Sequence, residues 1–247
     1  MKTKILSLFL IISTSIYSQN SEPIQADRPD QTETPAIVPK GMFQVETGFT
    51  FQKNDAISKS FTLPSTLWKY GVNENFELRL ITEFLSEELT KEKLNGLAPI
   101  YVGFKVKLAD EKGIIPKTSF IGHISLPNAA SKEFKTDFFA PEFRFVMQHT
   151  LSEKFSLSYN LGAEWDGFSA APTFIYTNAI GYSISNNLGS YIEIFGFIPQ
   201  KMNSNHSIDG GITYLISNNF MVDLSSGFGI SKNAPDYYWA LGFSFRI

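Results

Sequence analysis

The sequence contains no cysteine. Disulfide bonds, thiol catalysis, cysteine-ligated metals and a lipid anchor on cysteine are therefore excluded. Histidine is scarce as well, with three in 247 residues, and no cluster of His, Asp and Glu has the spacing of metal ligands. We therefore predict no metal site, no cofactor-binding site and no catalytic site.

A basic excess is also missing, because the formal net charge is −3. Nucleic-acid binding needs a basic surface, so no nucleic-acid partner is expected. Beyond the N-terminus, no run approaches the roughly 18 apolar residues of a membrane-spanning helix. A membrane protein built from this sequence would therefore have to cross the bilayer with strands.

Residues 1–18 have the layout of a secretory signal peptide. Two lysines precede an apolar run over 5–12, which is too short to span a bilayer, and a polar stretch follows. We place the cleavage near Ser18, with an uncleaved anchor helix as the alternative. The chain is therefore expected to be exported through the inner membrane.

Aromatic residues are abundant, with 23 Phe and 10 Tyr, although the mean hydropathy is only −0.07. Alternating apolar and polar positions produce this combination, and they are typical of half-buried strands. In residues 237–247 one face carries Tyr237, Trp239, Leu241, Phe243, Phe245 and Ile247. Similar runs cover 42–53, 60–72, 75–85, 98–109, 116–126, 137–150, 154–164, 173–185, 188–198, 206–216, 219–230 and 236–247.

The connections between these runs alternate in length, with five short turns and six longer stretches such as 85–97 and 127–136. This pattern places both chain ends at the short-turn end and is typical of outer-membrane barrels. A soluble sandwich would carry charge clusters on its outward face, and here those clusters lie in the longer loops. We predict an all-β fold, a transmembrane antiparallel up-and-down barrel of about 12 strands over residues 41–247, with both termini periplasmic.

The alternation also predicts which charged side chains face the lumen. They are Glu46, Lys69, Glu77, Arg79, Glu83, Lys105, Lys107, Glu142, Arg144, Glu164, Glu193, Asp209, Asp223 and Arg246. We expect Asp223 to pair with Arg246, and Lys69, Glu77 and Lys107 to form a second group. Neutralisation inside the wall, without any role in transport, is the alternative. A barrel of this width permits either a narrow pore or a filled core.

Residues 19–40 form a proline-rich lead segment before the first strand. Pro23, Pro29, Pro35 and Pro39 prevent helix formation and central-strand pairing there. The charged candidates Asp27, Arg28, Asp30 and Glu33 make the segment hydrophilic. It either enters the periplasmic mouth and plugs the barrel by pairing with lumen charges, or it is a disordered leader. Both interpretations remain open.

Three stretches carry a resemblance to a known family. They are "DRPDQTETPAIVPKGMFQVETGF" (27–49), "LWKYGVNENFELRL" (67–80) and "HSIDGGITYLISNNFMVDLSSGFGI" (206–230). The chain resembles the transporter-like outer-membrane family labelled "putative MetA-pathway of phenol degradation". The resemblance implies an outer-membrane barrel that moves small molecules, apolar or aromatic ones among them, and it transfers no binding residue.

We therefore predict a passive transporter or channel for small solutes in the outer membrane of a Gram-negative bacterium. Its expected partners are outer-membrane lipid, a small-molecule solute and the barrel-assembly machinery, which would contact the C-terminal strand. The protein is expected to be a monomer and not an enzyme. A non-transporting barrel that acts as a surface interaction scaffold is the alternative function.

A lipid-modifying enzyme is the third possibility. His123 and Ser125 share one face of a predicted strand, and Asp137 follows. The arrangement resembles outer-membrane phospholipase A, whose third residue is Asn where this sequence has Asp. A nucleophile needs its base within hydrogen-bond reach. The alternation points both side chains inward, whereas a lipid-cleaving site should face lipid.

Overall fold

The computed structural model describes residues 22–90 and 92–247, so the predicted signal peptide lies outside the described residues. The strands are β1 (Phe43–Lys53), β2 (Ser58–Asn73), β3 (Phe76–Leu89), β4 (Glu92–Leu97), β5 (Ile100–Ala109), β6 (Lys117–Leu126), β7 (Ala140–Thr150), β8 (Phe155–Glu164), β9 (Thr173–Ser183), β10 (Leu188–Pro199), β11 (Asn205–Ser217), β12 (Phe220–Gly229) and β13 (Tyr237–Arg246). A 3-10 turn, η1 (Lys132–Phe134), lies between β6 and β7. Among these residues, no helix has the length and apolarity needed to cross a bilayer.

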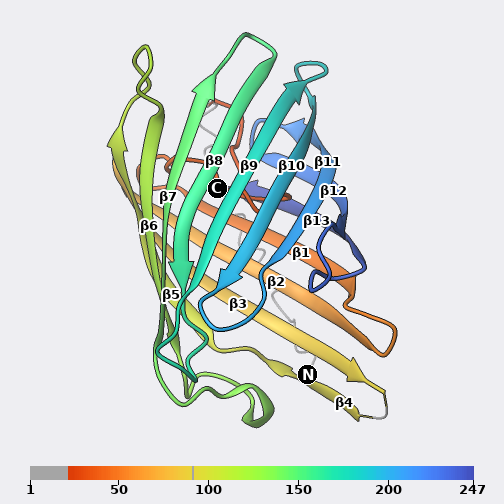
Figure 1. Cartoon of the computed structure of the whole chain (residues 1–247). Coiled ribbons are helices and arrows are strands. Elements are labelled where there is room, and N and C mark those ends of the chain that lie inside the picture. Colours follow the sequence, from red (N-terminus) through yellow and green to blue (C-terminus); the bar gives the residue numbers. More distant parts are fainter. Residues whose placement is uncertain (1–21, 91) are drawn as a thin grey trace, which may run out of the picture.

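The strands form one closed antiparallel barrel (Figure 1). Strands adjacent in the sequence pair with each other, except that β4 and β5 both pair with β3. β1 closes the barrel by pairing with β13, from Gln44 opposite Arg246 to Lys53 opposite Tyr237. β4 and β5 together make one barrel strand, interrupted where Pro99 lacks the N–H that a ladder needs. The barrel thus has twelve strands, which confirms the predicted all-β antiparallel barrel, while the periplasmic position of both termini stays a prediction.

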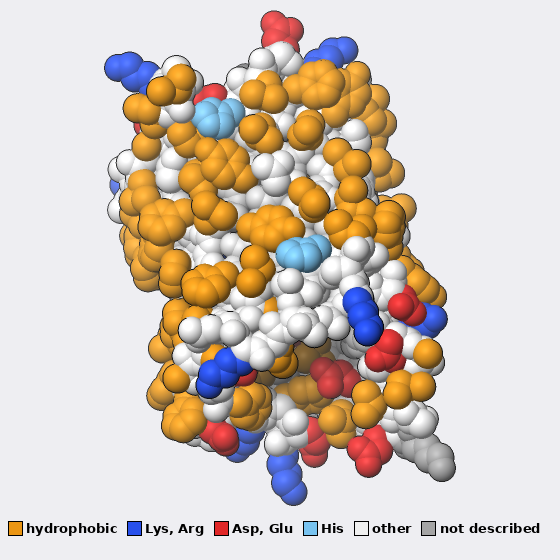
Figure 2. Space-filling model, viewed as in Figure 1, with side chains coloured by type: hydrophobic (Ala, Val, Ile, Leu, Met, Phe, Trp, Pro, Cys, Tyr) orange, Lys and Arg blue, Asp and Glu red, His pale blue; other side chains and the backbone are white. Residues whose placement is uncertain are grey.

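The two faces of the wall are the reverse of those of a soluble protein. Large apolar side chains lie exposed on the outside, among them Leu80, Phe145, Leu161, Ile192, Leu224 and Leu241. Buried positions are dominated by polar and charged side chains, among them Glu46, Lys69, Glu77, Lys105, Asn160 and Glu193. Figure 2 shows hydrophobic side chains over the middle of the wall and charged ones mainly towards its ends. This distribution suits a wall between hydrocarbon and a polar lumen.

One expected loop is an extension of the wall. The stretch 85–97 forms a hairpin, in which Phe84 to Leu89 of β3 pair with Glu92 to Leu97 of β4. It projects beyond the barrel at the end where the longer connections lie (Figure 1). The sequence suggested a loop because this stretch is rich in charged residues. Charged side chains are solvated equally well on an exposed hairpin, so they do not distinguish the two structures.

Candidate functional site

The described part of the lead segment, residues 22–40, runs through the inside of the barrel (Figure 1). It starts at the short-turn end, where the N–H of Ile24 donates to the Asn218 carbonyl at 2.8 Å. It returns to that end before β1, where the N–H of Gly41 donates to the Gly71 carbonyl at 2.7 Å. Between these points it crosses the lumen and contacts most of the strands.

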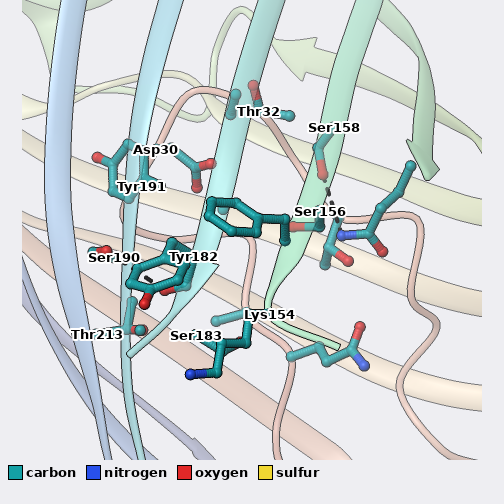
Figure 3. Close-up of a pocket in the computed structure, with 18 of the residues that line it drawn as sticks. Asp30, Thr32, Lys154, Ser156, Ser158, Tyr182, Ser183, Ser190, Tyr191 and Thr213 are labelled. Carbon is teal, nitrogen blue, oxygen red and sulfur yellow. Dashed lines mark hydrogen bonds between the residues drawn. The ribbon is translucent and has the colours of Figure 1, made fainter. Parts of the chain in front are cut away.

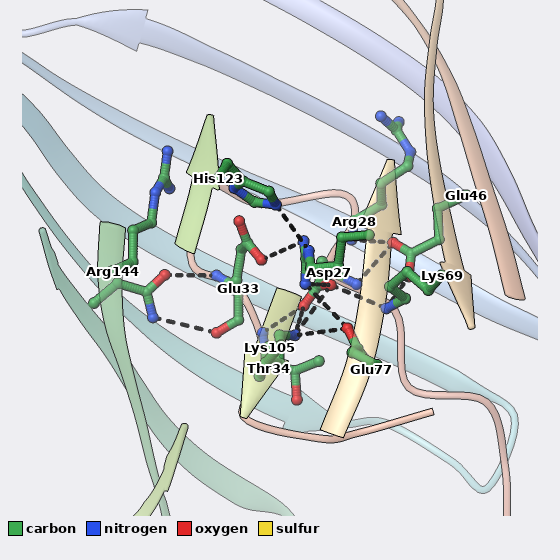
Figure 4. Close-up of polar contacts among 12 residues, drawn as sticks. Asp27, Arg28, Glu33, Thr34, Glu46, Lys69, Glu77, Lys105, His123 and Arg144 are labelled. Carbon is green, nitrogen blue, oxygen red and sulfur yellow. Dashed lines mark hydrogen bonds and ion pairs between the residues drawn. The ribbon is translucent and has the colours of Figure 1, made fainter. Parts of the chain in front are cut away.

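Asp27 is the most heavily bound residue of the lead segment. Its carboxylate accepts Lys69 Nζ at 2.9 Å, Lys105 Nζ at 2.9 Å and an Arg79 nitrogen at 3.1 Å. These three cations come from β2, β5 and β3, and their side chains are at most 1% exposed (Figure 4). Burial opposes ionisation of Asp27, but Lys105, Lys69 and Arg79 hold its pKa well below the ordinary value. Asp27 is therefore a buried, ionised anchor.

A second ring of carboxylates surrounds these cations. Glu46 lies 2.5 Å from Lys69 Nζ, and Glu77 lies 3.2 Å from an Arg79 nitrogen. Glu33, from the lead segment itself, accepts the other terminal nitrogen of Arg79 at 2.7 Å. The result is a network of alternating charges in which wall and lead segment neutralise each other, as buried charges require.

Backbone groups of the lead segment are bound by side chains of the wall. The N–H of Asp27 donates to Glu46 at 2.8 Å, and that of Val38 donates to Glu77 at 2.8 Å. Across the lumen the N–H of Gln31 donates to Glu193 at 2.8 Å. A segment outside any β-ladder must satisfy its buried N–H groups in another way, and here carboxylates do so.

Neutral side chains that the sequence analysis did not single out complete these contacts. The N–H of Glu33 donates to the Asn160 side-chain oxygen at 2.7 Å, and the Asn160 amide donates back to the Glu33 carbonyl at 3.2 Å. The Thr32 hydroxyl lies 2.7 Å from that of Thr177. Charge alone guided the choice of candidates, so Asn and Thr at inward positions were missed, although the same alternation marks them.

The expected pairings of low lumen charges are wrong in detail. Asp223 binds Arg28 of the lead segment at 2.8 Å, whereas Arg246 donates to the Asn219 side chain at 2.8 Å and to the Glu22 carbonyl. Lys107 binds Asp110 at 3.1 Å, outside the group around Lys69 and Glu77. Strand register predicts which residues of neighbouring strands lie side by side. It does not predict the partners that the lead segment brings into the lumen.

The remaining candidates lie on the inner face away from the Asp27 network. Glu83 accepts the Ser65 hydroxyl at 2.7 Å, and Glu142 binds Arg144 at 2.7 Å. Two pairs of carboxylates stand directly opposite each other on neighbouring strands, Glu142 with Glu164 and Glu193 with Asp209. The lining of the lumen by all fourteen candidates, and their role in transport, remain predictions.

Two cavities lie on opposite sides of the lead segment, and Arg28, Pro29 and Asp30 line both. One, of about 430 Å³, lies towards the short-turn end and is lined by hydroxyl groups, among them those of Ser156, Ser158, Ser190 and Thr213 (Figure 3). The other, of about 400 Å³, lies towards the long-loop end and includes Phe195, Phe197 and Tyr238. The lumen is therefore divided and is not solidly filled.

His123 and Ser125 do not form a nucleophile–base pair. Arg79 Nε donates to His123 Nε2 at 3.1 Å, and the Ser125 hydroxyl accepts the Ala140 N–H at 3.2 Å. Asp137 lies on the exposed connection before β7. In the described part of the chain, no three His, Asp or Glu side chains are grouped closely enough to hold a metal ion.

The fold and the site define a class, the outer-membrane-type β-barrel whose lumen is crossed by its own N-terminal segment. Within that class, the chain belongs to the family described as "Putative MetA-pathway of phenol degradation", whose model matches residues 26–247. The match includes the lead segment from Ala26 onward, and it confirms the resemblance seen in the sequence.

Solved structures share the fold at low sequence identity. The COG4313 outer membrane channel from Pseudomonas putida F1 has a TM-score of 0.68 at 9% identity, covering 86% of this chain and 97% of that one. The NanC porin has a TM-score of 0.54 at 10% identity, covering 83% and 100%. The translocator domain of the autotransporter NalP from Neisseria meningitidis has a TM-score of 0.50 at 10% identity, covering 85% and 90%. No curated protein matches the chain in sequence.

Proposed function

We propose that this protein is a passive channel for small solutes in the outer membrane of a Gram-negative bacterium, and that residues 22–40 plug it. The exposed apolar belt supports placement in a bilayer, and the buried charges support a polar interior. The Pseudomonas putida F1 protein that shares this fold is an outer membrane channel, which agrees with this function.

The observation that carries the proposal is the pair of cavities on either side of the lead segment. A scaffold that only displays surface loops needs a stable wall and gains nothing from hollow space within it. Here the lead segment and the side chains that contact it separate the two cavities and would block the passage of a solute. A channel that is closed at one point along its length would have such a cavity on each side of the block.

The family label and the wall of the outer cavity support apolar or aromatic molecules among the solutes. Phe195, Phe197 and Tyr238 line the cavity that faces the long-loop end. Flat aromatic side chains offer contact area to such molecules at low entropic cost. After passing the lead segment, these molecules would enter the hydroxyl-lined cavity, which is more polar, before they leave the barrel.

We expect a monomer in lipid, because β1 and β13 close the barrel, and among the described strands the edge of the short β4 is the one left without a strand partner. The C-terminal strand is the segment we expect the barrel-assembly machinery to bind. A lipid-modifying activity would be revealed by hydrolysis of phospholipid that a Ser125→Ala variant loses.

Liposome swelling with neutral solutes of graded size tests the channel. We expect the full chain to admit small solutes and to exclude larger ones. Ala240→Trp, which fills the outer cavity from β13, should slow the swelling severalfold, because the inward Ala240 lines that cavity. Leu241→Trp on the lipid face of the same strand is the matched control and should change nothing. Wild-type liposomes that do not swell would favour the scaffold.

A further inference from the structure

We propose that the plug opens at one place, residues 28–32, which we call the tip, while Asp27 and residues 33–38 stay fixed. Solutes would then pass along the wall formed by β9 to β13. The inference rests on the proposed channel function and assigns a latch to it: Arg28, seated in a socket of Gly48, Gly242 and Asp223.

The socket is shaped for the Arg28 side chain. Gly48 of β1 and Gly242 of β13 are direct cross-strand partners, and Asp223 of β12 is the next partner of Gly242. A Cβ atom on either glycine would overlap the Arg28 guanidinium. The guanidinium thus lies against bare backbone, and its end binds the Asp223 carboxylate at 2.8 Å. Only glycine at both positions leaves room for this arrangement.

The tip has fewer ion pairs than its flanks. Asp27 binds three buried cations, and Glu33 binds Arg79. Breaking such a network leaves buried charges without partners, which costs several kcal/mol. The tip instead has one ion pair, between Arg28 and Asp223. Its other contacts are hydrogen bonds of backbone and neutral groups: the Arg28 N–H donates to Glu46, the Gln31 N–H to Glu193, and the Thr32 hydroxyl contacts Glu193 and Thr177, while Arg144 donates to the Gln31 carbonyl. Pro29 has no N–H to donate.

Asp30 weakens the tip further. Among the described residues no Lys or Arg forms an ion pair with it. The titratable groups that face it are all acidic or neutral: Glu193 and Tyr191 of β10, Asp209 of β11, Tyr238 of β13, and Asp27. In Figure 3, Asp30 stands beside Tyr191 at the border of the cavity. Ionisation of Asp30 would therefore push the tip away from this wall.

Movement of the tip would join the two cavities, because Arg28, Pro29 and Asp30 separate them. The uncovered wall carries Glu193, Asp209 and, once Arg28 has left, Asp223. Apart from Arg28 itself, the one Lys or Arg among the residues lining the two cavities is Lys154, at the short-turn end. The joined path should thus admit neutral and cationic solutes more readily than anions of equal size.

The pH dependence follows from Asp30. Burial, and next the Glu193 carboxylate, raise the pKa of Asp30 well above its ordinary value. A carboxyl with a raised pKa favours the closed state fully below its ordinary pKa, and this contribution is lost as the pH rises through the raised value. We expect faster swelling at neutral than at acidic pH, and a weaker dependence in Asp30→Asn. An unchanged dependence in that variant would contradict the role of Asp30.

Gly48→Ala tests the latch, since the atoms nearest to its new methyl group all belong to the Arg28 guanidinium, which would be displaced. We expect swelling to increase severalfold in Gly48→Ala and, through loss of the ion pair, in Asp223→Asn. Gly122→Ala, on the outer face of β6, is the control for an added methyl group and should match the wild type. The opposite experiment fixes the tip to the wall with a disulfide bond. The hydroxyls of Thr32 and Thr177 lie 2.7 Å apart, so the double variant Thr32→Cys, Thr177→Cys should form this bond and block swelling until a reductant is added.

Thiol labelling decides which part moves, because the chain has no native cysteine. In the Gly48→Ala background, Pro29→Cys should react faster with a maleimide, whereas Ala36→Cys in the fixed flank should not. Faster labelling at both sites would overturn the hinged tip in favour of release of the whole segment. Unchanged labelling at both would overturn the latch. Faster labelling at position 29 without any swelling would keep the moving tip and refute the channel.

Discussion

Asp27→Asn is expected to weaken the hold of the barrel on its lead segment by about 3–5 kcal/mol, the usual cost of removing one partner from a buried ion network. Lys69, Arg79 and Lys105 would each lose a carboxylate within 3.1 Å. Since 1.4 kcal/mol corresponds to a factor of ten, the fraction of barrels with a released segment should rise about a hundredfold or more. Liposome swelling should therefore increase strongly.

Two further variants give the upper limit and the control for the swelling rate of Asp27→Asn. Deleting residues 22–38 removes the plug and gives the upper limit of swelling. Asp110→Asn removes the exposed partner of Lys107, and exposed ion pairs contribute at most about 1 kcal/mol. Swelling of Asp110→Asn should thus equal that of the wild type. If Asp27→Asn folds and swells no faster than Asp110→Asn, the Asp27 network does not hold the plug.

Ile192→Lys is expected to lower the free energy of unfolding by about 2–4 kcal/mol, the cost of a basic residue on the lipid face near the middle of the bilayer. Ile192 lies mid-strand in β10 and is 55% exposed on the outside of the wall. The new ammonium group could reach water only by bending away from the strand or by thinning the bilayer around it.

Ala179→Lys is the matched variant on the other face of the same wall. Ala179 of β9 stands opposite Glu193 of β10 and borders the hydroxyl-lined cavity, so a lysine there meets a carboxylate and space. Its stability should stay within about 1 kcal/mol of the wild type, as for most substitutions that break no buried contact. Unfolding by urea in liposomes measures the free energy of unfolding of both variants, Ile192→Lys and Ala179→Lys. Equal losses in the two variants would contradict the inside-out arrangement of the wall.

The site was only partly predictable, because its contacts join wall residues to the lead segment (Figure 4). Glu46, Lys69 and Glu77 could be assigned to the lumen from alternation, because neighbouring residues of a strand point to opposite faces whatever the fold. Their partner Asp27 could be identified only as hydrophilic and proline-flanked. No periodic pattern fixes the path of a segment without regular structure, so its contacts could not be read from its sequence.

Local chemistry decided most of the architecture. The period of two and the spacing of the turns were enough to predict the barrel, its strand number and the side that meets hydrocarbon, because each depends on residues close together in the chain. Closure of the barrel decided the rest. Gly48 and Gly242 come together only because β1 pairs with β13, and Asp223 then stands beside them to bind Arg28. Such a site between distant segments exists only once the wall is closed around the lead segment.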